Sequence, residues 1–369
     1  LVKIITLKTY IPILYWLPNY KLEYFKNDLI SGITVAIMLI PQGMAYALIA
    51  GLPPIYGLYA ALTPQIVYAF LGTSKQLAVG PVAMDSLLVA AGLGAISIVG
   101  PSQYIQMALL LALLMGVIQF VLGLLRMGFI VAFLSKPVIS GFTSAAAIII
   151  GLNQIKHILG ISIPQSNKIH VFISLIMNSQ TQINFYTLAI GLISILLLIG
   201  IKKWNTKIPS ALVVVIMSIF YVSFTNYDQM GLAIVGNIPD GLPNFIFPVL
   251  EWDIIKSLLP ISLTIALVGF MEAISIAKSI EEKNKTDEIN PNQELIALGA
   301  SNIIGSFFQS YPISGGLSRS AVNDESGAKS GISAIISAFI VALIIIFFTS
   351  YLYHLPKAVL SSIIIVAVF

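Results

Sequence analysis

The sequence predicts an all-α polytopic membrane protein in which two helices are broken inside the membrane. Of its 369 residues, 58% are hydrophobic and only 9% are charged, whereas about 25% of residues are charged in soluble domains. Apolar runs that are long enough to cross a bilayer as helices recur along the chain. Two of these runs, Leu77–Gly94 and Ser310–Gly327, are interrupted by glycine and proline.

Unbroken helices are predicted where an apolar run is bounded by glycine, proline or charged residues. They cover Asp28–Ala50, Pro54–Leu71, Tyr104–Leu125, Val138–Ile155, Phe185–Ile201, Pro209–Phe224, Ile254–Ile280, Glu294–Phe308, Gly331–Tyr351 and Pro356 to the end. Residues 1–27 carry Trp and Tyr beside Lys and are expected to lie at the membrane interface. Residues 162–182 are expected at the surface, and the proline-rich stretch 226–253 is the longest loop.

The first broken segment reads LAVGPVAMDSLLVAAGLG. Because proline fits the first turn of a helix, we expect extended chain over Leu77–Gly80 and a half-helix over Pro81–Gly94. A helix that begins inside the membrane presents unpaired N–H groups and a positive dipole end, which together favour an anion.

The second broken segment, SYPISGGLSRSAVNDESG, has the same form, with breaker residues followed by a short helix from about Leu317. Two broken segments at matching places in two halves of a chain indicate the binding site of a secondary transporter.

An internal repeat supports this architecture. The stretch ITVAIMLIPQGMAYA from Ile33 aligns without gaps to LTIALVGFMEAISIA from Leu263, so that Gln42 meets Glu272. Seven predicted segments separate the two starts, and an odd number requires the copies to be inverted in the membrane. The predicted fold is therefore an inverted repeat in which the two half-helices meet at the membrane midplane.

The positive charges predict the orientation. Most fall on one side of the predicted helices, namely Lys3, Lys8, Lys21, Lys26, Lys75, Arg126, Lys136, Lys202, Lys203, Lys207, Lys278, Lys283, Lys285 and Lys329. The other side holds Lys156, Lys168, Lys256 and Lys357. By the positive-inside rule, the N-terminus is expected in the cytoplasm and the protein in the cytoplasmic membrane, with loop 226–253 outside.

Arg319 is the charged side chain predicted near mid-membrane in the second broken segment. An unpaired charge at that depth is costly, so the side chain should face a cavity or an anion. The hydroxyls of Ser318 and Ser320 and the backbone N–H groups of Val82 and Ala83 are candidate additional donors.

Glu272 lies inside a predicted helix, where an ionisable carboxyl is a candidate proton carrier. The alternative is a structural partner for Arg319 or Lys278. For Arg319, the alternative to an anion-binding role is that its side chain reaches toward the cytoplasm or pairs with Glu272 or Asp324.

Three further polar residues lie near the predicted site. Gln42 and Tyr46 are one turn apart on one helix face. Both are able to donate to an anion, although Gln42 is equally suited to a carbonyl of the broken helix. Asp85, one turn into the first half-helix, is either a second titrating group or a structural acceptor, and we favour the acceptor.

Other function classes find little support. The chain has no cysteine, which excludes disulfides and thiolate chemistry. It contains no hydrolase, metalloprotease or phosphate-cradling motif, and its three histidines fall at helix ends and outer loops. We therefore predict no enzyme activity, no cofactor, no metal site and no nucleic-acid partner. An anion channel is a remaining alternative.

Long motifs resemble the sulfate permease (SulP) family of anion transporters. They are PQGMAYALIAGLPPIYGLYAAL from Pro41, GTSKQLAVGP from Gly72, NQELIALGASNIIGSFFQSYPISGGLSRSAVN from Asn292 and LPKAVLSSIII from Leu355. The resemblance implies two inverted repeats of seven segments, which form a core domain and a gate domain. It also implies an elevator-like movement of the core against the gate, and a homodimer.

The resemblance implies roles for particular residues. The central anion site would be lined by Gln42, Tyr46, Val82, Ala83, Ser318 and Arg319. Glu272 matches the acidic position of proton-coupled members. One turn later this sequence has Ile276. Sodium-coupled bicarbonate members resemble each other in having a threonine at that position, so the isoleucine argues against sodium coupling.

The domain boundaries that follow are a lead-in at 1–27, a core domain at 28–126 and 254–353, a loop at 226–253, and a gate domain at 127–225 and 354–369. The chain stops within the twelfth segment, so the second repeat is expected to be incomplete and a STAS domain to be missing.

The expected function is secondary active transport of a small inorganic anion across the bilayer, with sulfate as the first candidate and protons carried by symport. The alternatives are a chloride/bicarbonate exchanger or bicarbonate importer, and then an anion channel.

Overall fold

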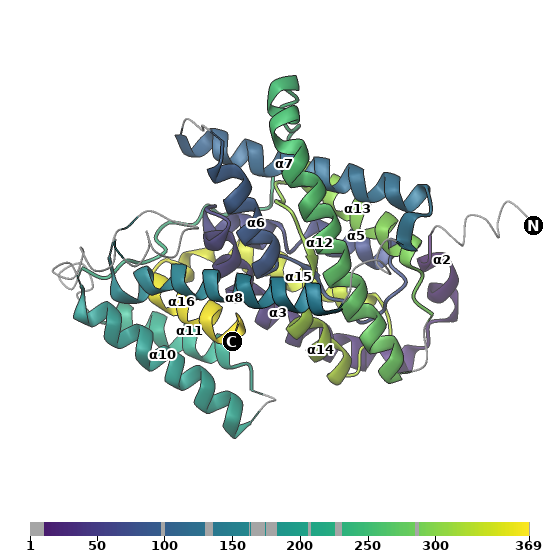
Figure 1. The fold of residues 1–369 in the computed structure, drawn as a ribbon. Helices are drawn as coiled ribbons and strands as arrows, with labels where there is room; N and C mark the ends of the chain where they lie inside the picture. Colours follow the sequence, from purple (N-terminus) through teal and green to yellow (C-terminus); the bar gives the residue numbers. More distant parts are fainter. Residues whose placement is uncertain are drawn as a thin grey trace, which may run out of the picture.

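The computed structural model is almost entirely helical (Figure 1). It describes residues 11–96, 100–129, 136–161, 163, 174, 183–205, 208–225, 231–284 and 288–368. In this part of the chain, four helices are long and apolar enough to cross a membrane, namely α3 (Leu22–Ile49), α7 (Gly100–Leu124), α10 (Phe185–Trp204) and α12 (Trp252–Asn284). The prediction of a polytopic all-α fold therefore agrees with the structure.

Shorter elements connect and cover these four helices. The α-helices are α2 (Ile13–Trp16), α4 (Pro54–Tyr59), α5 (Thr63–Leu71), α6 (Ala83–Gly94), α8 (Lys136–Leu159), α11 (Ser210–Ser223), α13 (Pro291–Phe307), α14 (Leu317–Glu325), α15 (Ile332–Phe347) and α16 (Lys357–Val368). Two 3-10 turns, η1 (Leu17–Asn19) and η4 (Thr349–Leu352), and two strands, β1 (Val79–Gly80) and β2 (Ser314–Gly315), complete the described elements.

Two sequence-based boundaries are wrong. The single helix predicted over Pro54–Leu71 is two helices, α4 and α5, because Pro64 has no N–H for a continuous helical ladder and instead starts α5. Helix α3 begins at Leu22, so the end of the lead-in 1–27 is helical. Its Asp28 does not mark a helix start. Instead, the side chain is buried inside α3 and accepts hydrogen bonds from Tyr20 and from the backbone of Ser330.

The remaining boundaries differ by a few residues. Helix α12 begins at Trp252, so the loop predicted over 226–253 ends at Glu251. Its described part is irregular apart from a bridge between Ile234 and Pro356. The surface segment predicted over 162–182 lies outside the described residues, apart from residues 163 and 174.

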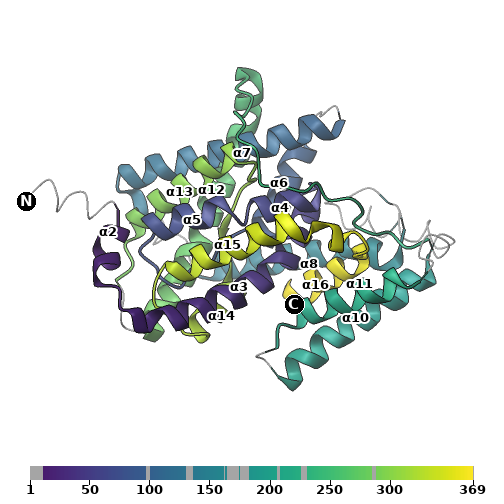
Figure 2. The same ribbon diagram turned by 180° about the vertical axis from the view of Figure 1, so that it is seen from behind.

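One hydrophobic cluster forms where α7, α12 and α13 pack together. Its buried side chains include Leu111 and Met115 of α7, Phe270 and Ile274 of α12, and Leu298 of α13. In both views α7 and α13 run side by side along one edge of the molecule (Figure 1, Figure 2).

A second hydrophobic cluster lies between α3 and the helices α8, α10, α11 and α16. It includes Leu39, Met44, Ile150, Leu198 and Leu360. Helices α10, α11 and α16 lie together at the opposite end from α2 (Figure 1, Figure 2). The outer faces of α10 and α11 expose large apolar side chains such as Leu196 and Phe220, as expected for surfaces in contact with lipid.

Glycines allow the closest helix contacts. A Cβ atom on Gly57 of α4 would come within 1.9 Å of the carbonyl oxygen of Gly43 in α3. A Cβ atom on Gly299 of α13 would come within 2.5 Å of the backbone nitrogen of Phe120 in α7. Small residues allow such close backbone contact between membrane helices, where dispersion supplies much of the association energy.

Gly57→Ala is expected to lower the melting temperature of the detergent-solubilised protein, because overpacking a tight contact costs about 1–3 kcal/mol. Gly200→Ala in α10 is the matched control, since a Cβ atom there meets nothing within 4 Å. Equal melting temperatures for the two variants would show that α3 and α4 do not pack as closely as described.

Candidate functional site

The two broken segments meet in a short antiparallel strand pair. Val79 of β1 lies opposite Gly315 of β2, and Gly80 lies opposite Ser314. Strand β1 leads into α6 and β2 leads into α14. Because the strands are antiparallel, the two half-helices leave the pair in opposite directions. As predicted, neither segment crosses the membrane as one unbroken helix.

Side-chain hydrogen bonds fasten this strand pair to α14. The Ser320 hydroxyl accepts a hydrogen bond from the Ala78 backbone N–H at 2.9 Å and donates to the Gly316 carbonyl at 2.8 Å. The Asn323 amide donates to the Gln76 carbonyl at 3.0 Å. The start of the first half-helix and the body of the second are therefore held in one fixed register.

Arg319 lies between these elements and is 1% exposed. Its Nη1 donates to Oε1 of Gln42 at 3.4 Å, while its Nε and Nη2 have no hydrogen-bond partner among the described residues. It packs directly on Gly316, where a Cβ atom would come within 2.5 Å of Nη2. The guanidinium thus folds back over the N-terminus of its own helix and also lies near Gly80.

Gln42 and Tyr46 of α3 are both buried beside this guanidinium. Oε1 of Gln42 accepts a hydrogen bond from Nη1 of Arg319. Tyr46, one turn further on, interacts electrostatically with both Arg319 and Glu272. Helix α3 therefore supplies one wall of the site.

The N-termini of the two half-helices supply the backbone groups. Val82 is the N-cap of α6 and Ala83 is its first residue, so the half-helix starts two residues later than predicted. The first helical hydrogen bonds are donated by Ser86 in α6 and Ser320 in α14, which leaves the earlier N–H groups without a partner in their own helix. Ser318 belongs to the first turn of α14, but its side chain is exposed and does not join the buried cluster.

Glu272 lies on α12 and is half-buried, with Oε2 buried and without a hydrogen-bond partner among the described residues. It forms no ion pair with Lys278, which binds Glu281 at 2.6 Å. Asp324, another proposed partner of Arg319, binds Lys283 at 2.8 Å instead. The purely structural alternatives for Glu272 and Arg319 are therefore not formed.

The interpretation of Asp85 as a structural acceptor is wrong. It lies in the first turn of α6 with no exposed surface, and neither carboxylate oxygen accepts a hydrogen bond from any described residue. It is not a structural acceptor in this part of the chain.

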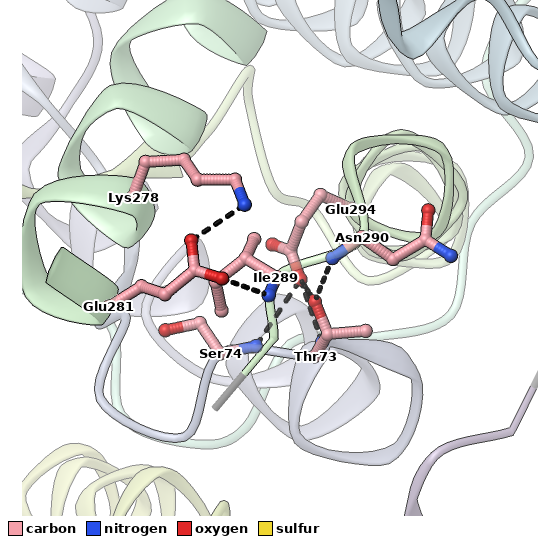
Figure 3. Close-up of polar contacts among 7 residues, drawn as sticks. All are labelled: Thr73, Ser74, Lys278, Glu281, Ile289, Asn290 and Glu294. Carbon is pink, nitrogen blue, oxygen red and sulfur yellow. Dashed lines mark hydrogen bonds and ion pairs between the residues drawn. The ribbon is translucent and has the colours of Figure 1, made fainter. Parts of the chain in front are cut away.

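A second polar cluster holds the loop that leads into β1 (Figure 3). Oε1 of Glu294 accepts from the hydroxyl and the N–H of Thr73 at 2.6 and 2.7 Å, and from the Ser74 N–H at 3.3 Å. Oε2 accepts from the Tyr68 hydroxyl at 2.7 Å. The Thr73 hydroxyl also accepts from the Asn290 N–H at 3.2 Å.

The role of Glu294 was not predicted from the sequence, because a glutamate in the first turn of a helix is a common terminal feature. The role of Thr73 was not predicted either, since it lies in a loop between two predicted helices. One signal for Glu294 was available, namely a carboxyl at the start of an otherwise apolar helix. A carboxyl that is fully buried there requires several hydrogen-bond donors around it.

Apolar helices around a buried cation, with two helix N-termini beside it, are typical of multi-pass membrane proteins with a functional site inside the bilayer. The model of the sulfate permease family matches residues 25–369. The chain therefore belongs to the sulfate permease family, as its motifs predicted, and this is a family of transporters and not of enzymes.

Curated relatives agree with this assignment. The chain is 42% identical over 367 residues to the chloroplastic sulfate transporter 4.1 of Arabidopsis thaliana, covering 98% of this chain and 53% of that protein. It is 36% identical over 398 residues to the sodium-independent sulfate anion transporter of Bos taurus, covering 98% and 64%. The chain thus spans about half the length of the first of these relatives and less than two thirds of the second.

Solved structures agree on the fold. The overall structure of SLC26A9 superposes with a TM-score of 0.93 at 30% identity, covering 98% of this chain and 60% of that one. The transmembrane domain of BicA, a cyanobacterium bicarbonate transporter, superposes with a TM-score of 0.86 at 23% identity, covering 95% and 89%. At that identity the BicA match bears on the fold alone.

Glu294→Gln is expected to lower the melting temperature of the detergent-solubilised protein by several degrees. The amide replaces an acceptor oxygen with a donor that faces N–H and O–H groups, and hydrogen bonds to charged groups are worth about 1.5–3 kcal/mol each. Glu282→Gln is the control, because Glu282 is exposed on the adjoining helix end. A variant as stable as the control would show that Glu294 does not hold the Thr73 loop.

Proposed function

We propose that the chain forms the membrane part of a secondary active transporter that takes up sulfate together with protons. The observation that carries this proposal is the guanidinium of Arg319, which is 1% exposed and has two nitrogens without a partner among the described residues. A buried charge with free donors is costly unless a ligand of opposite charge completes its hydrogen bonds.

The site has the donors that an inorganic oxyanion requires. Two N–H-bearing nitrogens of Arg319 and the first-turn N–H groups of α6 and α14 replace part of the hydration shell of the anion. Arg319 is suited to this role because its planar donors match tetrahedral oxyanions in pairs. Gln42, Tyr46, Val82, Ala83 and, through its backbone N–H, Ser318 complete the proposed binding site.

Sulfate is the first candidate because the relatives are named for it. They include high affinity sulfate transporters 1 and 2 of Stylosanthes hamata, which are 38% identical to this chain. Bicarbonate is the second candidate, as the sequence predicts. Both are small oxyanions, and the same donors suit both.

Glu272 is the proposed proton carrier. Its Oε2 is buried without a hydrogen-bond partner among the described residues, and Arg319 acts on it electrostatically without forming an ion pair. A carboxylate there offsets part of the Arg319 charge. Protonation of Glu272 removes this competitor, so that the proton and the anion bind together.

We propose an elevator-like movement of the core domain against the gate domain. The second hydrophobic cluster is the interface along which this movement would take place, because it joins α3 of the core domain to α8, α10, α11 and α16 of the gate domain. The antiparallel strand pair supports the inverted repeat, and the distribution of Lys and Arg supports a cytoplasmic N-terminus. A homodimer in the cytoplasmic membrane completes the proposal.

Uptake of labelled sulfate into vesicles that contain the full-length protein tests the function. An inward proton gradient is expected to drive accumulation above the external concentration, and a protonophore is expected to abolish it. Accumulation driven by a chloride or bicarbonate gradient would favour an exchanger. Equilibration without accumulation under every gradient would favour a channel.

Glu272→Gln is expected to reduce gradient-driven accumulation at least about tenfold while sulfate still binds. The amide cannot bind a proton, and one coupled proton in a gradient of one pH unit drives about tenfold accumulation. Accumulation by this variant equal to that of the unmodified protein would remove Glu272 from the coupling mechanism. Glu282→Gln, on an exposed surface, is the control.

Arg319→Gln is expected to weaken sulfate binding by roughly 10- to 100-fold, since charged hydrogen bonds are worth about 1.5–3 kcal/mol. Isothermal titration of the purified protein measures the affinity. Lys203→Gln removes an equal charge from an exposed position and is expected to leave the affinity unchanged. Equal affinities for both variants would show that Arg319 does not contact the anion.

A further inference from the structure

Asp85 is a buried carboxyl that the proposed mechanism does not yet use. It is the third residue of α6, it has no exposed surface, and both of its oxygens lack a hydrogen-bond partner among the described residues. A carboxylate at this helix position ordinarily accepts from the free N–H groups of the first turn. Here no side-chain cap is formed at the start of α6.

The carboxyl of Asp85 is directed at α12. A Cβ atom on Gly269 of that helix would lie 3.2 Å from Oδ2 and 3.3 Å from Oδ1 of Asp85. The missing side chain at Gly269 is therefore what makes room for the carboxyl. Glu272 lies three residues further along α12 and so on the same face as Gly269, and it acts electrostatically on Asp85.

The other elements around Asp85 bring no cation that binds it. The segment before β2 contributes Tyr311, whose hydroxyl lies 3.1 Å from that of Ser86, and α7 contributes the apolar Met115 next to Gly269. From α14, Arg319 acts on Glu272 and on Tyr311.

The two remaining helices that pack on α6 also leave Asp85 unpaired. Helix α3 brings Tyr46 to the same cluster. Helix α8 places the uncharged Asn153 and Gln154 beside a different part of α6, around Leu87 and Ala90, in a cavity of about 220 Å³.

An ionised carboxyl in this position would be costly. It has no donor among the described residues, and the penalty for an unpaired buried ion is several kcal/mol. The nearby carboxyl of Glu272 adds repulsion between like charges. Both effects are removed when Asp85 carries a proton.

We propose that Asp85 is a second proton site, which shares the transported proton with Glu272. This inference rests on the proposed proton coupling and extends it from one carboxyl to a pair. Glu272 is the outer member of the pair because it is only half-buried. Asp85 is the inner member because it is fully enclosed.

A hydronium ion gives a proton to the Glu272 carboxylate and leaves as water. The Glu272 carboxyl then gives this proton to the Asp85 carboxylate and becomes a carboxylate again, so that the pair holds one proton in all. The protonated pair carries one negative charge less, which weakens its competition for the field of Arg319 and the helix N-termini, and the anion binds. Return of the proton through Glu272 to water restores the negative charge and favours release of the anion.

The test compares Asp85→Asn, Glu272→Gln and the double variant in vesicles that contain the full-length protein. Gradient-driven sulfate accumulation is measured against pH, alongside exchange of labelled sulfate at equal pH. Asp253→Asn is the matched control, because Asp253 is also in the first turn of a helix but is exposed.

Asp85→Asn is expected to lower gradient-driven accumulation about tenfold, to reduce exchange by less than that, and to shift the pH midpoint by about one unit, the size expected for two interacting carboxyls. The effects of the two single substitutions are expected to be non-additive, as for residues that share one proton. A pH midpoint equal to that of Asp253→Asn, or strictly additive effects, would overturn the shared site.

Infrared spectroscopy gives a readout that does not depend on transport. The purified protein at neutral pH is expected to show the carbonyl band of a protonated carboxyl, and Asp85→Asn is expected to remove it without loss of thermal stability, because the amide matches the neutral acid in shape. A band that persists in Asp85→Asn would overturn the assignment. If that variant does not fold, absence of the band in the unmodified protein overturns it equally.

Absence of proton-driven uptake in the unmodified protein would overturn the proposed function, and with it the coupling role of Asp85. Failure of the inference alone has a different signature. In that case the unmodified protein and Asp85→Asn couple equally well, and only Glu272→Gln loses accumulation.

Discussion

The structure depends on the burial of one positive charge. A guanidinium that is 1% exposed and lacks partners for two of its nitrogens in the described residues would be expelled from an ordinary apolar core. It is retained because the backbone around it is fixed by other contacts. The strand pair and the amide of Gln42 hold the side chain in place without neutralising it, and the glycine at 316 leaves room for it.

That arrangement explains why the polar contacts divide into two kinds. The contacts that fix the backbone, such as Ser320 with Ala78 and Glu294 with Thr73, are hydrogen-bonded, and Ser320 and Glu294 are buried. The groups proposed to act on the anion and the proton keep unused donors or acceptors. Stability thus comes from satisfied groups next to the site, and the unsatisfied groups within it are available for ligands.

Much of the fold was predictable from the sequence, because membrane burial makes apolar runs and their breaks easy to recognise. The two broken segments were placed to within a few residues, since Pro81 and the glycine pair at 315 and 316 interrupt otherwise helical patterns. The break between α4 and α5 was missed because the apolar character of the sequence continues through it. Pro64 was the available signal.

The site residues were harder to predict than the elements that carry them. Arg319 and Glu272 stood out because ionisable side chains are rare in apolar segments. Whether they pair with each other, and whether Asp85 has a donor, depends on contacts between residues far apart in sequence. Periodicity carries no information about such contacts. For the same reason the role of Glu294 became visible only when α13 and the Thr73 loop were seen together (Figure 3).

The contact between Thr73 and Glu294 also constrains how the protein is made. The two residues are 221 positions apart, so the loop that leads into the first half-helix receives its anchor only after that further stretch of chain has been synthesised. Strand β1 likewise waits for β2. The first broken segment therefore enters the bilayer with an unfinished centre, which the second broken segment completes during translation or after it.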